Sequence, residues 1–229
     1  MSTKYRPRSI IILVLSLAVG IISTCSSAAA QTPTPTPPMA NMVSAEKGNP
    51  TKESDFRAAM RKLWEDHITW TRLFIISAAA DLPDKAATTE RLLKNQTDIG
   101  NAMKAYYGNE AGDKLTALLK DHITTAAELV AAAKAKDNVK VEAAKKKWYA
   151  NSDEIATFLS GANPKNWAAD EMKKHMREHL DLTLTEATAR LSGDWAADIA
   201  AYERVHEQIL HMADMLSSGI IKQFPEKFK

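Results

Sequence analysis

The sequence predicts an all-α protein, an up-down bundle of six helices made of three repeated helical hairpins. Two observations support this prediction. Only Pro83 and Pro164 interrupt the long C-terminal part of the chain before its last few residues, and no stretch there shows the apolar–polar alternation of a strand. Similar sequence blocks are centred on His67, His122 and His179, which lie 55 and 57 residues apart.

Residues 1–30 are predicted to be a secretory signal. Three basic residues precede an apolar run from Ile10 to Ile22, and three alanines at 28–30 supply the small residues of a cleavage site. The run is shorter than the roughly 20 residues that span a membrane. An uncleaved anchor and a lipid on Cys25 remain open as alternatives. We therefore expect an exported protein (periplasmic, cell-surface or extracellular) that meets the membrane only through an uncleaved or lipidated N-terminus.

Residues 31–50 are predicted to be a linker. The segment begins with a Thr-Pro repeat at 32–38 and holds five of the nine prolines of the chain. Such a composition favours an extended, semi-rigid chain rather than a helix or an inner strand. The folded domain is therefore expected to occupy residues 51–229.

Turn and capping residues divide this domain into helices. The breaks are at Pro83-Asp84, Gly108-Asn109, Asp137-Asn138, Gly161 to Asn166 and Gly193-Asp194. They predict helices at 52–81, 85–107, 110–135, 139–160, 167–192 and 195–222. Because the connections are short, consecutive helices are expected to run antiparallel.

The repeat places polar residues at positions where the helical spacing predicts a core. His67 and His122 each lie within an apolar stripe of their helix. Counting residues to each turn, at about 1.5 Å per residue, brings the polar residues of the returning helices to a similar height. We expect one polar layer inside the bundle, formed by His67, Asn95, Asp98, His122, Asn151, Glu154, His179 and His206.

Helical bundles commonly build metal sites from inward side chains at one level. Imidazole and carboxylate ligands suit Zn, Fe, Mn or Cu, so a transition-metal site is one interpretation of this layer. A second interpretation is a purely structural layer, whose polar groups satisfy one another and fix the helix register. A site for a small organic ligand or haem is the least favoured of the three.

Composition excludes several classes of function. Outside the predicted signal the chain carries 27 basic and 28 acidic residues and no basic run, which gives no electrostatic basis for binding nucleic acid. The only cysteine is Cys25, so the domain has no disulfide, thiolate zinc site or covalent haem link. It also lacks a glycine-rich phosphate loop, so no nucleotide is expected.

Several blocks occur in the order that is typical of an uncharacterised family of exported, small, all-helical bacterial and archaeal proteins. The sequence resembles that family at 63–67, 70–77, 92–95, 148–155 and 222–225. The resemblance implies a helical bundle and adds weight to the histidines and to Asn95, Asp98, Asn151 and Glu154, but it implies no activity. Members sometimes carry the label acetylglutamate kinase, which this sequence does not support.

We therefore expect an exported bundle that binds or senses a metal rather than turning over a substrate. Two alternatives stay open. One is a tethered structural or interaction module with a metal-free polar layer. The other is a metal-dependent oxidoreductase or hydrolase that uses the same layer, with an open coordination position for water or oxygen.

Overall fold

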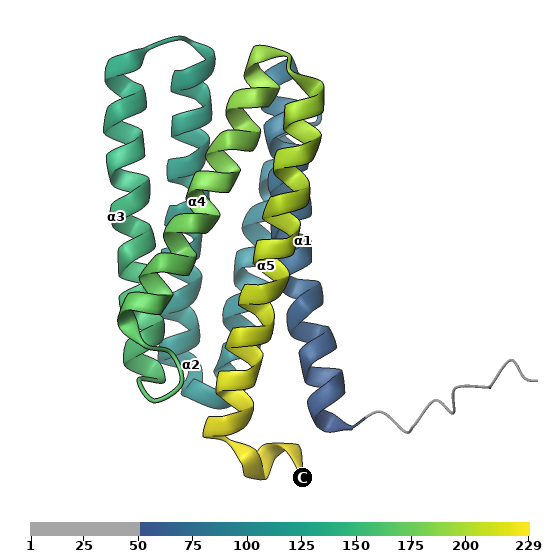
Figure 1. Ribbon diagram of the computed structural model, residues 1–229, viewed down its shortest axis with the longest axis vertical. Coiled ribbons are helices and arrows are strands. Elements are labelled where there is room, and N and C mark those ends of the chain that lie inside the picture. The colour runs from purple at the N-terminus through teal and green to yellow at the C-terminus, as the bar shows by residue number, and fades with distance from the viewer. Residues whose placement is uncertain (1–50) are drawn as a thin grey trace, which may run out of the picture. The chain divides into compact units, whose positions relative to one another are not determined.

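The computed structural model describes residues 51–229 (Figure 1). No strand occurs within this range, so the all-α prediction is confirmed. The elements are α1 (Lys52–Ala80), α2 (Lys85–Lys134), α3 (Asn138–Ala162), α4 (Ala169–Ser192), α5 (Trp195–Gln223) and the short 3-10 helix η1 (Pro225–Phe228). None of these helices is both long and apolar enough to cross a membrane. The predicted signal at 1–30 and linker at 31–50 lie outside the described residues.

The structure has five α-helices where the sequence predicts six, because the predicted second and third helices form one element, α2. This element is sharply broken at Gly108, whose φ of 84° and ψ of 170° are accessible mainly to glycine. Lys104 Nζ lies 2.6 Å from Asp113 Oδ1, although nine residues of straight helix would separate them by about 13 Å. α2 therefore folds back at Gly108, and we call residues 85–107 its first arm and 109–134 its second arm.

Side chains at the N-termini cap three helices. Thr51, Asp137 and Asp194 each accept a hydrogen bond from the backbone N–H three residues later, at 3.2, 3.1 and 3.0 Å. These bonds satisfy N–H groups that the start of a helix leaves without a partner. At the other end of α4, Gly193 takes a φ of 79°, the left-handed conformation that commonly terminates a helix.

Consecutive helices pack against one another, and α5 returns to pack against α1 (Figure 1). α4 also contacts both α1 and α2, so these three helices meet in the interior of the bundle. The core between them is apolar, and its fully buried side chains include Ile68, Ile155, Met172, Ile209 and Met212. The polar side chains that share this interior are therefore exceptions that need an explanation.

Candidate functional site

Three buried histidines lie together where α1, the second arm of α2 and α4 meet. His67 on α1 and His122 on α2 are each 3% exposed, and His179 on α4 is 4% exposed. The ring centroids are 5.6 Å apart for His67 and His179, 6.3 Å for His122 and His179, and 6.5 Å for His67 and His122. We call this arrangement the histidine triangle. The structure thus brings together the three histidines that the sequence places at equivalent positions.

Each histidine contacts a carboxamide that lies 29 residues further along the chain, on the returning helix of its hairpin. His122 Nδ1 lies 3.0 Å from Asn151 Oδ1, and His179 Nδ1 lies 3.3 Å from Gln208 Oε1. Because an amide oxygen only accepts, these two Nδ1 atoms carry the proton and donate it. The Nε2 atoms of His122 and His179 are therefore the unprotonated ring nitrogens.

The backbone holds these carboxamides in place. Asn151 Nδ2 donates to the carbonyl of Leu118 at 3.1 Å, and Gln208 Nε2 donates to the carbonyl of His175 at 3.0 Å. Each carbonyl belongs to the residue four positions before the histidine of that hairpin. The same two hydrogen bonds thus occur at His122 and at His179, and they fix which nitrogen of each ring carries the proton.

At His67, two neighbouring residues make the two contacts that a single carboxamide makes at His122 and at His179. Asn95 Nδ2 donates to the carbonyl of Leu63 at 3.0 Å, while Gln96 lies against the ring, with its Nε2 3.2 Å from His67 Nδ1. Gln96 Nε2 also donates to the carbonyl of Leu92 and to Asn95 Oδ1. Gln96 Oε1 is buried and has no hydrogen-bond partner among the described residues. Because an amide nitrogen only donates, His67 Nδ1 accepts here, and Nε2 of this neutral ring carries the proton.

The triangle is an uncharged site at neutral pH. Burial lowers the pKa of His122 to about 3 and that of His179 to about 4. Burial, followed by repulsion from the other two rings, lowers the pKa of His67 well below its usual value. Within residues 51–229, no Nε2 atom of the triangle makes a hydrogen bond. Three neutral imidazoles in the interior thus each have one nitrogen without a partner.

Three residues that the sequence places in the polar layer lie elsewhere, and the prediction is corrected for them. Asp98 pairs with Lys94 Nζ at 2.9 Å on the surface. Glu154 is exposed. His206 Nε2 lies 2.9 Å from Glu65 Oε1 at the surface.

The error is one of helical register. Asp98 and His206 are each two residues from a carboxamide that does reach the triangle, and two residues turn a helix by about 200°. Gln96 and Gln208 are these carboxamides, and the sequence interpretation missed both. The signal that finds them is the constant spacing, because each of the three carboxamides follows its histidine by 29 residues.

The triangle is slightly wider than a bound metal ion requires. Zn–N distances of about 2.0–2.1 Å in a tetrahedral site place the ring centroids of three ligands about 5.2 Å from one another. The edge between His67 and His179 is about 0.4 Å longer than this, and the two edges at His122 are more than about 1 Å longer. Accordingly, no three His, Cys, Asp or Glu side chains in residues 51–229 form a ready-made metal site.

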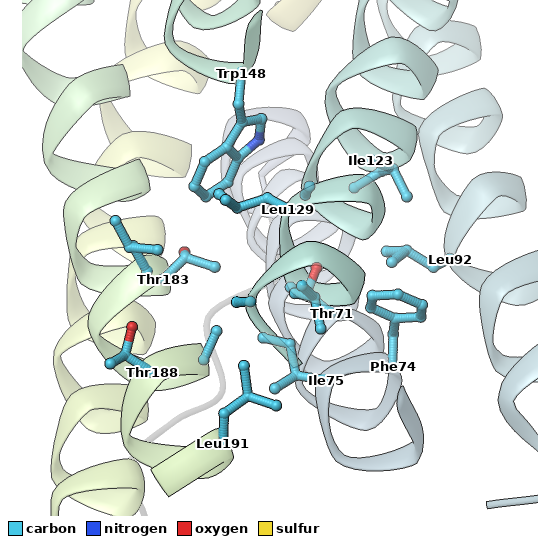
Figure 2. A pocket seen from close by; sticks show the side chains of 15 residues that line it. Thr71, Phe74, Ile75, Leu92, Ile123, Leu129, Trp148, Thr183, Thr188 and Leu191 are labelled. Atoms are coloured by element: carbon cyan, nitrogen blue, oxygen red, sulfur yellow. The ribbon is translucent and has the colours of Figure 1, made fainter. Parts of the chain in front are cut away.

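An apolar cavity of about 40 Å³ lies beside the triangle, along the same helices (Figure 2). Its lining includes Thr71, Ala126 and Thr183, each of which is four residues after a histidine of the triangle. The cavity therefore begins about one helical turn from the histidines.

No protein-family model, curated protein or solved structure matches this chain. We therefore infer the function from the geometry of the histidine triangle and of the cavity beside it.

We expect the metal-free protein to unfold in acid. Unfolded histidine binds a proton near pH 6.5, whereas His122 and His179 bind theirs only near pH 3 and 4 when folded. Between pH 6.5 and 4 the unfolded chain thus binds more protons, so stability falls as the pH falls, by up to about 1.4 kcal/mol per pH unit for each histidine. Burial raises the pKa of Glu186 to about 7, so this carboxyl adds stability as the pH falls. It is one group, whereas the three histidines lower the stability.

Urea unfolding followed by circular dichroism at pH 7, 6 and 5 measures this effect. The His122→Gln variant removes one of the three titrating groups, so its stability is expected to depend less steeply on pH. A free energy of unfolding that stays constant from pH 7 to 5 would contradict the neutral, buried state of the triangle.

Proposed function

We propose that this protein binds one transition-metal ion through Nε2 of His67, His122 and His179. The observation that supports this proposal is the meeting of three buried, neutral imidazole rings whose Nε2 atoms make no hydrogen bond within residues 51–229. An ion at the centre of the triangle would give all three nitrogens a partner at once. It would require the rings at the two longer edges to approach by about 1.1–1.3 Å.

The carboxamides supply the orientation that a metal-binding imidazole needs. Metal-bound histidine almost always donates its other ring N–H to an oxygen, which holds the ring in place. Asn151 and Gln208 already provide such oxygens. For His67, a half-turn of the Gln96 carboxamide, with the ring proton moved to Nδ1, would provide the third, at the cost of the hydrogen bonds that Gln96 Nε2 donates to Leu92 and Asn95. Neutral imidazoles suit Zn²⁺, Cu²⁺, Fe²⁺ or Ni²⁺. In this proposal all protein ligands of the ion are imidazole nitrogens, and the carboxylates of the sequence prediction are not ligands.

Binding or sensing fits this site better than turnover. The carboxylates that the sequence assigns to the layer, Asp98 and Glu154, lie at the surface. A hydrolase would use an acid or base next to the metal-bound water, and the acids expected in that role are not at the triangle. Three protein ligands would nevertheless leave a fourth position open, as in catalytic zinc sites.

We also propose that the bundle is a threefold repeat of one helical hairpin and that the protein is exported. Three hairpins, each with a histidine on the first helix and its carboxamide on the second, are supported by the recurring distance of 29 residues. Export is supported by the basic start and apolar run of the first 30 residues.

The competing function is a structural or interaction module whose polar layer holds no metal. The two long edges of the triangle favour it. Elemental analysis separates the two functions after the purified protein is incubated with Zn²⁺, Co²⁺, Cu²⁺, Fe²⁺ or Ni²⁺ and passed through a desalting column. We expect about one ion per chain for at least one metal and a higher melting temperature with that metal. Less than a tenth of an ion per chain for all five, with no change in melting temperature, would support the module instead.

A further inference from the structure

We propose that the apolar cavity beside the histidine triangle is a binding site for a small, uncharged, apolar molecule of one to a few heavy atoms, comparable in size to xenon or dioxygen. This inference goes beyond metal binding, because it depends on the shape and the lining of the cavity and not on an ion.

The cavity lies in the same interior space as the triangle. α1, the second arm of α2 and α4 contribute most of its wall, and Leu92 of the first arm of α2 and Trp148 of α3 complete it (Figure 2). On α1 and α4 the lining repeats every four residues from the histidine, with Thr71 and Ile75 on α1 and Thr183 and Ala187 on α4. A molecule in the cavity would thus lie next to the ring layer, separated from it by about one helical turn.

The chemistry of the wall selects an apolar occupant. No charged side chain lines the cavity. The hydroxyl groups of Thr71 and Thr183 donate to the carbonyls of His67 and His179, both at 2.8 Å, so each has a hydrogen-bond partner on its own helix. Trp148 Nε1 is the one polar atom of the wall that is buried and has no hydrogen-bond partner among the described residues. A water molecule in a site needs two to four polar partners, and a cavity that is apolar instead binds apolar probes such as xenon.

The size of the cavity sets the upper limit of the ligand. Its volume of about 40 Å³ exceeds the roughly 10–15 Å³ that one water requires. Protein interiors are normally packed too densely to leave such a space. On the opposite side of the triangle the interior is filled by large side chains, including Trp64, Leu115, Leu118 and Met176.

Two residues of the cavity lining reach the surface of α4. Thr188 and Leu191 of α4 line it nine and twelve residues beyond His179, and they are exposed and half-buried respectively. These residues are thus several turns from the triangle. A small molecule would enter past them and travel toward the histidines.

Xenon titration of the metal-free full chain tests the proposal. Methyl resonances of Ile75, Ile123, Leu129 and Leu191 are followed in ¹H–¹³C spectra after treatment with EDTA. We expect shifts that saturate with xenon pressure and are confined to methyls around the cavity. Formamide, a polar molecule of a few heavy atoms, is expected to leave these resonances unchanged.

Filling the cavity gives the matched comparison. Ala187→Leu adds three carbons at a buried position of the wall, and Ala126→Met fills the end nearer the triangle. We expect either variant to lose the xenon shifts, whereas Ala150→Leu at an exposed position of α3 retains them. Shifts that do not saturate in the unchanged protein, or that saturate with formamide, would overturn the proposal.

The outcome is independent of metal binding. Saturable xenon shifts in a protein that takes up no metal would leave the cavity site standing and remove the metal site. Metal uptake without xenon shifts would leave the metal site standing and remove the cavity site.

Discussion

The His122→Ala variant is expected to lose more than about 100-fold in metal affinity. Removing a residue that only orients a metal ligand typically costs 10–100-fold, so removing one of three ligands should cost more. His122 is buried beside the other two rings, and no carboxylate of the predicted layer is placed to replace it. Competition with a chromophoric zinc chelator at pH 7.5 measures the dissociation constant of the ion.

His206→Ala is the matched control. The sequence assigns His206 to the same layer, but the structure places it at the surface beside Glu65. Its removal is expected to leave the zinc affinity unchanged. Equal losses in the two variants would mean that the ion binds elsewhere, and an unchanged affinity in His122→Ala would remove the triangle as the site.

The Arg72→Met variant is expected to lose about 3–5 kcal/mol of stability, the cost of breaking a buried ion pair. Arg72 Nη1 lies 2.8 Å from both Glu186 Oε1 and Asp198 Oδ1. The side chains of these two acids are only 2% and 1% exposed. Methionine keeps much of the packing of Arg72 but leaves the two buried carboxylates with only Arg190 nearby, which lies 3.3 Å from Asp198.

Urea unfolding at pH 8 and pH 6 measures this loss. Burial raises the pKa of Glu186 to about 7, so at pH 6 this carboxyl is largely protonated and needs its cation less. The loss in Arg72→Met is therefore expected to be larger at pH 8 than at pH 6. Arg61→Met, which breaks the exposed pair with Asp214, is the control and should cost less than about 1 kcal/mol. A similar cost for the two variants would contradict the account of the buried pair.

The sequence predicts the fold well because the helix ends carry local signals. The helix caps involve only nearby residues and lie where the sequence predicts a helix to begin or end. They are formed by Thr51, Asp137 and Asp194 at helix starts and by Gly193 at the end of α4. Gly108 marks a further break. The residues on both sides of Gly108 are helical, so the two predicted helices follow each other without a loop and form the two arms of α2.

The site is predicted in part. His67 and His122 stand out because an imidazole in an apolar stripe is unusual, and His179 stands out by its spacing from them; the structure buries all three. The carboxamide partners depend on how two helices are aligned along their axes. An error of two residues in that alignment replaces Gln96 by Asp98 and Gln208 by His206. The cavity could not be predicted, because its volume depends on how side chains from four helices pack together.

The most direct test of the central claim is the zinc K-edge absorption spectrum of the zinc-loaded protein. The histidine triangle requires three imidazole nitrogens at about 2.0–2.1 Å from the ion, with one further light ligand from solvent. The multiple-scattering features of imidazole count these ligands. Three imidazoles, reduced to two in the His122→Ala variant at high zinc concentration, are the expected result. A first shell with one imidazole or none would contradict the claim.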